Sequence, residues 1–327
     1  MSIRSSWLRR PFSGLLASLL ALCLMAGTAW AQGGKTLRFV VGYPPGGSGD
    51  FVTRTVGEAI AGELGVTPII DNRPGAAGNL ATEVVIKSND GATLLVASNP
   101  YINKALYKKL NYDVDKDLTP ITLLGNGPMV IAVNSALPVH SIAELVAHAK
   151  KNPGKLNFAS SGNGSSPHLA GVLFNSVFDV NIIHIPFKGG APAVQSVIAG
   201  DTQVIYGTSP VVLPQVRGGR IRALAITTQD KSAAIPGIMG IKEAGQPHYN
   251  ISFSFGLYAP SSWPASEVQR VFEAAAKVLQ RPEIRDKLAT QGMDPAPNAS
   301  PADFKAANLR EAPMWAQLIS ASGAKVD

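Results

Sequence analysis

The stretch "TLRFVVGYPPGGSGDFVTR" (residues 36–54) contains the pattern that decides the fold. Its apolar start, "TLRFVV" (36–41), predicts a strand, and the glycine-rich loop "YPPGGSGDF" (43–51) follows. Apolar side chains then recur at helical spacing, which predicts a helix over 50–65. A glycine loop between a strand and a helix brings backbone N–H groups to a helix N-terminus, where an anion is favoured.

The same alternation of strand and helix returns along the chain. Further strands are predicted over residues 67–71, 93–98, 128–135, 156–161, 182–187, 202–209, 221–228 and 254–260. Further helices are predicted over residues 80–88, 141–154, 169–178, 193–200 and 265–280. Such alternation predicts α/β lobes built on parallel sheets. Because the pattern restarts in the middle, we expect two lobes, residues 32–126 with 254–327 and residues 127–253.

The first 31 residues predict a signal peptide. They contain three arginines, an apolar run over 14–27 and the small-residue pattern "AWA" (29–31). The apolar run is short for a membrane span, and no longer one follows, so no span is expected in the mature chain. Arg9 and Arg10 partly match a twin-arginine signal, but the general secretory route is favoured. We therefore expect the protein to be exported.

Composition narrows the class of protein. The 327 residues are 46% hydrophobic and 16% charged, which is typical of globular proteins. The net charge of +7 falls to +4 in the mature chain. The sequence has no basic stripe interleaved with aromatic residues, so nucleic-acid binding is not predicted. Cys23, the only cysteine, lies in the signal peptide, so no disulfide is expected. The five histidines are dispersed without metal-ligand spacing, and no metal or cofactor is predicted.

Three loops of similar composition follow predicted strands and precede predicted helices. They are "PPGGSGD" (44–50), "SSGNGSSPH" (160–168) and "FKGGAP" (187–192). Ligands of open α/β sheets bind beyond the carboxyl ends of the strands. One such loop is more often a simple turn, but three across two lobes favour an anion site between the lobes.

The first loop does not fit a phosphate. No lysine follows Gly49, as a P-loop requires, and Val52 stands where a dinucleotide motif needs its third glycine. Asp50 would also repel a phosphate. A carboxylate carries less charge and can be bound by neutral donors alone.

Several polar residues have simpler structural interpretations. We expect Asp50 to cap its helix or to pair with Arg54 rather than to contact a ligand. His168 is expected to make a structural hydrogen bond, and His184 to be a satisfied core histidine. Lys188 is expected to be solvated, although it could steer anions.

The serines of the second loop are predicted to be hydrogen-bond donors. Because the chain has no G-x-S-x-G motif, Ser165 and Ser166 do not look like nucleophiles. Ser48 could cap the first helix, and Ser166 could cap the next one, with Pro167 at its first position.

Seven segments together carry a family resemblance: "YPPGGSGDFVTR", "DNRPGAAGN", "DGATLLVAS", "FASSGNGSSPHLAG", "HIPFKGGAPAV", "GRIRALAITT" and "EAGQPHY". In this order they resemble the Bug-type (TctC-like) periplasmic solute-binding proteins of tripartite tricarboxylate transporters, over essentially the whole mature chain. The resemblance implies an α/β "Venus flytrap" of two lobes, type II-like, each lobe a mainly parallel sheet flanked by helices.

The resemblance also implies a ligand site and a function. Carried over by position, the ligand-binding residues are Gly46, Gly47, Ser48, Asp50, Ser161, Gly162, Ser165, Ser166, Lys188, Gly189 and Ala191. Phe187 departs from the family, which often has tyrosine there, so the pocket wall loses a hydroxyl. The protein would capture a small organic carboxylate as a monomer and deliver it to the permease subunits, without catalysis.

Two alternatives remain open from the sequence. One is a periplasmic, hydrolase-like enzyme on a two-lobed scaffold, although no nucleophile–base set is evident. The other is a ligand sensor for a signalling partner. Aliphatic di- or tricarboxylates, acidic amino acids and aromatic acids all remain possible ligands.

Overall fold

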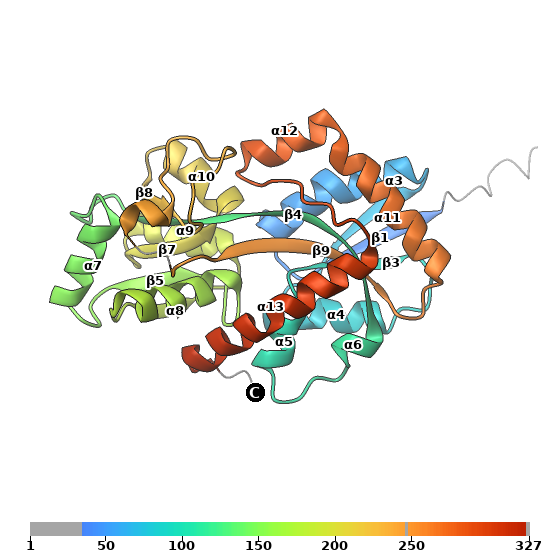
Figure 1. Ribbon diagram of the computed structural model, residues 1–327, viewed down its shortest axis with the longest axis horizontal. Coiled ribbons are helices and arrows are strands. Elements are labelled where there is room, and N and C mark those ends of the chain that lie inside the picture. The colour runs from blue at the N-terminus through green and yellow to red at the C-terminus, as the bar shows by residue number, and fades with distance from the viewer. Residues whose placement is uncertain (1–34, 246–247, 325–327) are drawn as a thin grey trace, which may run out of the picture. The chain divides into compact units, whose positions relative to one another are not determined.

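The computed structural model of the chain describes residues 35–245 and 248–324 (Figure 1). The predicted signal peptide, residues 1–31, lies outside the described residues. The strands are β1 (Thr36–Val41), β2 (Thr67–Asn72), β3 (Thr93–Ala97), β4 (Leu118–Asn134), β5 (Asn157–Ser160), β6 (Ile183–Pro186), β7 (Val204–Thr208), β8 (Ile221–Ile226) and β9 (Ser252–Pro260).

Helices connect most of these strands. They are α2 (Ser48–Val52), α3 (Glu58–Glu63), α4 (Asn79–Ile86), α5 (Tyr101–Leu106), α6 (Val114–Asp117), α7 (Ile142–Lys151), α8 (Ser166–Phe178), α9 (Gly190–Ala199), α10 (Ser209–Arg217), α11 (Ala265–Gln280), α12 (Pro282–Thr290) and α13 (Pro301–Ser322). A π-helical turn, η1 (Thr53–Gly57), joins α2 to α3, and η2 (Ala76–Gly78) and η3 (Ile241–Ala244) are single 3₁₀ turns.

The described strands form one sheet in the order β2-β1-β3-β9-β4-β7-β5-β6, and β8 also pairs with β4. The long strand β4 changes partners along its length. Residues 118–128 pair with β9, whereas residues 129–134 pair with β7 and β8. Figure 1 shows β4 and β9 running through the middle of the molecule, with helices on either side.

The sheet as a whole is mixed, although the strands of each predicted lobe run mainly in one direction, as expected. β1 runs parallel to β2 and β3, and β5 runs parallel to β6 and β7, as predicted. However, β9 is antiparallel to β3 and β4, and β4 is antiparallel to β7 and β8. The apolar pattern of a strand does not specify its direction, which depends on the connections around it.

Strand β1 shows how the fold positions the first loop. Phe39 and Val41 face one side of the sheet and pack with Val52 of α2 in one core cluster. Val40 faces the other side and packs with Ala81 of α4. Because neighbouring side chains of a strand point to opposite faces, helices cover both faces, and the loop after Val41 emerges at the sheet edge.

Several element boundaries differ from the sequence prediction. The helix predicted over 50–65 begins at Ser48 and contains the π-helical turn. The strand predicted over 128–135 is the second half of β4, which begins at Leu118. The first half has no clear strand pattern in the sequence, because it contains Pro120 and Gly125, where the pairing register with β9 shifts. α10 and α13 were missed, and each contains an internal proline, Pro214 or Pro313.

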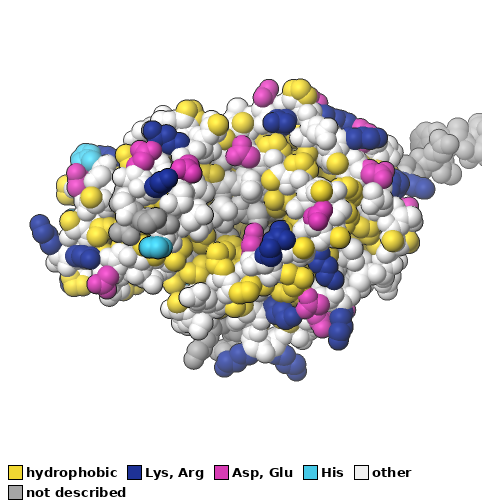
Figure 2. All heavy atoms as spheres, in the orientation of Figure 1, with side chains coloured by type: hydrophobic (Ala, Val, Ile, Leu, Met, Phe, Trp, Pro, Cys, Tyr) yellow, Lys and Arg dark blue, Asp and Glu magenta, His cyan; other side chains and the backbone are white. Residues whose placement is uncertain are grey.

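The surface carries charges of both signs. Figure 2 shows basic and acidic side chains interspersed over one face rather than gathered into a single-sign stripe. Within residues 35–245 and 248–324, no helix is both long and apolar enough to cross a bilayer. In the same ranges no group of three or more His, Cys, Asp or Glu side chains is placed to bind a metal ion.

Candidate functional site

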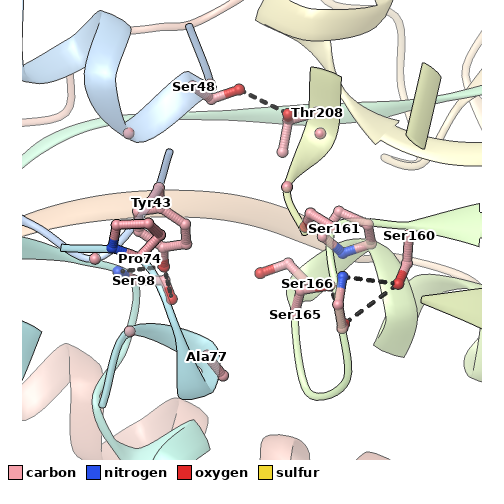
Figure 3. Close-up of a pocket in the computed structure, with 18 of the residues that line it drawn as sticks. Tyr43, Ser48, Pro74, Ala77, Ser98, Ser160, Ser161, Ser165, Ser166 and Thr208 are labelled. Carbon is pink, nitrogen blue, oxygen red and sulfur yellow. Dashed lines mark hydrogen bonds between the residues drawn. The ribbon is translucent and has the colours of Figure 1, made fainter. Parts of the chain in front are cut away.

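A cavity of about 720 Å³ lies where the three predicted loops meet (Figure 3). The loops after β1, β5 and β6 all contribute to its wall. Eight of the eleven predicted ligand residues line it: Gly47, Ser48, Ser161, Gly162, Ser165, Ser166, Lys188 and Gly189. The other three, Gly46, Asp50 and Ala191, are not among the residues that line the cavity.

Asp50 is buried and holds the first loop in shape. Its carboxylate accepts hydrogen bonds from the Gly46 N–H (3.0 Å), from Arg54 Nε (3.0 Å) and from Asn72 Nδ2 (3.0 Å). Asn72 Nδ2 also donates to the carbonyl oxygen of Tyr43. Burial alone would raise the pKa of Asp50, but the hydrogen bonds, led by that of Arg54, outweigh it and lower the pKa. The predicted pairing with Arg54 is confirmed, and Asp50 acts on the loop rather than on the cavity.

The glycines of the first loop differ in why the structure requires glycine at each position. Gly46 has a φ of +75°, which favours glycine. A Cβ atom on Gly49 would lie 2.5 Å from Cδ2 of Tyr43, so the approach is too close for another residue. Gly47 has an ordinary φ of −84° and is the N-cap of α2, where neither Ser48 nor Asp50 serves as the predicted cap.

Ser48 and Gly49 bring donors to the cavity. Both line it, and both lie in the first turn of the helix, where backbone N–H groups have no partner within the helix. The hydroxyl of Ser48 also forms a 2.7 Å hydrogen bond with the hydroxyl of Thr208, at the end of β7 (Figure 3). The first loop is thereby joined to the strand that lies beside β5.

Hydrogen bonds within the serine loop fix its shape. Ser165, not Ser166, caps α8: its Oγ accepts from the His168 N–H and donates to the Gly162 carbonyl. The predicted cap, Ser166, is therefore wrong by one residue, because helix α8 already begins at Ser166. Ser161 and Ser166 line the cavity, and their hydroxyls make no hydrogen bond to the described residues. These two hydroxyls are therefore free to bind a ligand.

Two stacked histidines support the serine loop from behind. The rings of His168 and His184 lie 3.9 Å apart and nearly parallel. His168 Nδ1 accepts from the Gly164 N–H (3.1 Å), and His184 Nε2 bonds with Ser160 Oγ (2.6 Å), which accepts from the Gly162 N–H. The structural hydrogen bond predicted for His168 is confirmed.

Both histidines are neutral near pH 7. Burial lowers the pKa of His168 to about 4. Burial, followed by the charge of His168, lowers the pKa of His184 to about 3. Because His168 Nδ1 accepts a hydrogen bond, its remaining ring proton lies on Nε2.

The Ser160–His184 contact brings together a hydroxyl and an imidazole, the components of a hydrolase site. Ser160 is fully buried, however, and its hydroxyl is already bonded to both backbone groups of Gly162. A histidine with a pKa of about 3 is also a weak base at neutral pH. The pair therefore supports the loop and does not form a nucleophile and its base.

The third loop packs against the first. Gly189 has a φ of +112°, and a Cβ atom there would lie 2.8 Å from Cγ of Pro44. Phe187 lines the cavity, and Lys188 lines it as an exposed residue. The three loops therefore surround one space.

The sequence prediction missed much of the cavity wall. The missed lining residues include the turn 74–78, Ile102 of α5 and Tyr107 after it, Ser98, Thr208 and residues 253–255 of β9, together with Ala193, Ile205, Gly207 and Val211. Only the turn had a sequence signal, "DNRPGAAGN", which predicts a turn and nothing more. In the structure Ala76 and Ala77 have φ values of 50° and 53°, an uncommon left-handed conformation for residues other than glycine.

The fold and the cavity define a periplasmic-binding-protein architecture, and comparisons identify the family. The model of the tripartite tricarboxylate transporter family receptors (TctC) matches residues 52–323. Protein BugT of Bordetella pertussis is 31% identical over 296 residues, covering 89% of this chain and 90% of the relative.

Solved structures of similar proteins support the same family. R. palustris Rpa4515 with adipate has a TM-score of 0.84 at 29% identity, covering 90% of this chain and 98% of that one. The periplasmic binding protein BugD has a TM-score of 0.82 at 26% identity, covering 89% and 98%.

The chain belongs to the tripartite tricarboxylate transporter receptor (TctC) family. It has the α/β periplasmic-binding-protein fold of this family, with a mixed sheet and flanking helices. The family consists of solute-binding proteins and not of enzymes, as the resemblance implied.

Proposed function

We propose that this protein captures a small organic carboxylate in the cavity and delivers it to the membrane permease of a tripartite tricarboxylate transporter. The observation that carries the proposal is the convergence of three glycine loops on one cavity, lined by free serine hydroxyls and the first turn of a helix. A structural relative with adipate supports a carboxylate as the ligand.

The predicted lobes, residues 32–126 with 254–327 and residues 127–253, agree with the path of β4. The strand changes partners between residues 128 and 129, close to the predicted boundary. The Ser48–Thr208 bond and the Pro44–Gly189 contact would then join the two lobes above the ligand. We propose a monomer whose closed form the permease recognises.

The proposal includes export by the predicted signal peptide, by the general secretory route. Membership of a family of periplasmic binding proteins supports it. Protein purified from the periplasm should begin at Gln32 when its mass is measured. A mature chain that retained Met1 would refute this part of the proposal.

Calorimetry on three variants tests how the anion is bound. The probe is the acid that gives the largest thermal shift in a carboxylate screen, since a ligand at 100 times its Kd stabilises the native state by about 2.7 kcal/mol. Gly47→Val should weaken binding by at least about 100-fold, because its branched side chain would stand between the ligand and the N–H groups of Ser48 and Gly49.

The other two variants should have smaller effects. Ser166→Ala should cost one neutral donor, about 2- to 12-fold in Kd. Lys188→Ala should lower mainly the association rate, in a salt-dependent way. If Lys188→Ala abolished binding while Gly47→Val bound normally, a cation would hold the ligand and the backbone account would be wrong.

Small-angle scattering tests whether the two lobes close on the ligand. Addition of the same ligand to the wild-type protein should give a smaller radius of gyration, and an unchanged value would count against closure of two lobes.

A further inference from the structure

A hydrogen bond between two hydroxyl groups joins two sides of the cavity wall. Ser48 Oγ, in the first turn of α2, lies 2.7 Å from Thr208 Oγ1, at the end of β7 (Figure 3). Both residues line the cavity. Ser48 falls in the first predicted lobe and Thr208 in the second, so this hydroxyl pair would join the lobes at the ligand site.

Other side-chain hydrogen bonds of the described residues also join the predicted lobes, but they lie outside the cavity wall. Ser209 Oγ donates to the Gly292 carbonyl (2.9 Å), and Arg217 Nη1 donates to the Thr290 carbonyl (2.8 Å). None of these four residues lines the cavity. Among such bonds in the described part of the chain, a ligand in the cavity can therefore reach only the hydroxyl pair.

The position of Thr208 in the chain would normally direct its hydroxyl elsewhere. Thr208 is the N-cap residue of α10, a position where a threonine hydroxyl usually accepts a hydrogen bond from a backbone N–H of the helix. Here the side chain makes no such bond. Thr208 is paired with Met129 in the sheet, beside the point where β4 changes partners. Its hydroxyl is thus held toward Ser48 instead of capping the helix.

The hydroxyl pair keeps one hydrogen to donate. Each hydroxyl has one hydrogen and two lone pairs, so whichever side chain donates within the pair, the hydrogen of the other is not used. Neither hydroxyl makes a further hydrogen bond to the described residues. Because both residues line the cavity, the remaining hydrogen can be donated to an oxygen atom of a ligand.

A carboxylate is the acceptor that would strengthen the pair most. Hydrogen bonds to a charged acceptor are shorter and roughly twice as strong as those between neutral groups. A hydroxyl that donates to an anion also becomes a better acceptor, so its bond with the second hydroxyl is strengthened. Such coupling is reciprocal: the ligand stabilises the pair, and the pair stabilises the bound ligand.

We propose that Thr208 positions the Ser48 hydroxyl for the ligand, so that the two hydroxyls bind the carboxylate as one unit and hold the predicted lobes together while it is bound. This inference rests on the function proposed above, and it adds to that function a positioning residue and a link between ligand and closure. It predicts that loss of either hydroxyl costs nearly as much affinity as loss of both.

Calorimetry on a double-variant cycle tests whether the hydroxyls act as one unit. Adipate, citrate, glutamate and benzoate are screened on the full mature protein, and the acid that binds most tightly is used for all variants. Ser48→Ala and Thr208→Val should each raise the Kd at least about tenfold, because a hydrogen bond to a charged group is lost. The double variant should stay within about threefold of the single variant that binds more weakly. Valine keeps the branched shape of threonine, and no cap bond is lost with the Thr208 hydroxyl.

Two further variants separate this role from a purely structural one. Thr208→Ser keeps the hydroxyl and should bind within about threefold of the wild type. Thr202→Val is the matched control, because Thr202 Oγ1 and Ser196 Oγ form a hydrogen bond of the same length (2.7 Å) inside the second predicted lobe, away from the cavity. It should leave the Kd unchanged. In Thr208→Val the loss should appear mainly in the dissociation rate, since the pair forms only when the lobes meet.

The results that would overturn the inference are distinct. Thr208→Val binding like the wild type would show that the pair does not act on the ligand. A double variant weakened by the product of the two single effects would show two independent hydroxyls. Equal losses in Thr208→Val and Thr202→Val would indicate general destabilisation instead. If none of the four acids bound the wild type, carboxylate capture itself would be overturned, and this inference with it.

Discussion

The loops at residues 42–50 and 160–168 look alike in sequence but are stabilised differently. Each follows a strand with a parallel neighbour, precedes a helix and lines the same cavity. Each contains a glycine in the same left-handed conformation, Gly46 with a φ of +75° and Gly164 with a φ of +74°. The resemblance ends at the groups that hold each loop in place.

A buried charge supports the first loop, and two uncharged rings support the second. Asp50 accepts hydrogen bonds from Gly46 and Arg54 in the first loop. In the second, His168 Nδ1 accepts a hydrogen bond from the N–H of Gly164, and His184 Nε2 forms a hydrogen bond with the hydroxyl of Ser160. Loops of one composition can therefore respond differently to packing changes, to loss of charge and to pH.

Alanine at Gly164 should have the largest effect on stability. A left-handed alanine costs about 1–2 kcal/mol at either loop glycine, Gly46 or Gly164. At Gly164 the added Cβ would also lie 2.3 Å from Cδ2 of buried Leu106, whereas Gly46 has no atom within 4 Å. We expect Gly164→Ala to lower the free energy of unfolding by about 3 kcal/mol and Gly46→Ala by about 1 kcal/mol.

Chemical denaturation measures both values, and a double variant separates the causes. Adding Leu106→Ala to Gly164→Ala should remove the steric part of the cost, so the two changes should not be additive. Equal costs for Gly46→Ala and Gly164→Ala would show that the contact with Leu106 does not constrain the serine loop.

Removal of the Asp50 carboxylate should have the next largest effect. Asp50→Ala leaves the Gly46 N–H and the Asn72 amide without their acceptor and Arg54 without its partner. We expect a loss of about 2 kcal/mol, less than for a fully buried pair because the Arg54 side chain is 49% exposed. Glu267→Ala, which breaks an exposed pair with Arg270, is the control and should cost less than about 1 kcal/mol. Equal losses for the two variants, measured by urea unfolding, would contradict the role of Asp50.

Mild acid should destabilise the protein through the serine loop. His168 and His184 have pKa values of about 4 and about 3 in the native state, against about 6.5 when unfolded. Between these values the unfolded chain binds more protons than the native one, so the free energy of unfolding rises with pH. Their contribution is complete above about pH 6.5 and is lost as the pH falls toward 4. From pH 8 to pH 6 we expect the pair to account for a loss of about 1.6 kcal/mol.

Thermal unfolding at several pH values checks this expectation. The double variant His168→Asn with His184→Gln keeps an amide near each hydrogen-bonding nitrogen but cannot titrate. It should show a flatter dependence on pH than the wild type, whereas His140→Gln, at an exposed position, should not. A slope unchanged in the double variant would rule out these two histidines as its source.

Local patterns in the sequence predicted much of the fold. The strand at 36–41 and the helix at 265–280 have the predicted bounds, because apolar periodicity and breaking residues act within a few positions. Eight of the eleven predicted ligand residues line one cavity, since loops at the carboxyl ends of neighbouring strands emerge at one sheet edge. Their contacts with a ligand remain a prediction.

The sequence by itself determined the alternation of elements, the glycine loops and, through the resemblance, the family. Only the tertiary structure decided that Asp50 accepts a hydrogen bond from Asn72, that Thr208 reaches Ser48, and that Phe253 and Phe255 line the cavity. These contacts join residues far apart in the chain, from Ser48 to Thr208 for example. Their pairing depends on strand order and direction in the sheet, which local hydrophobic patterns do not encode.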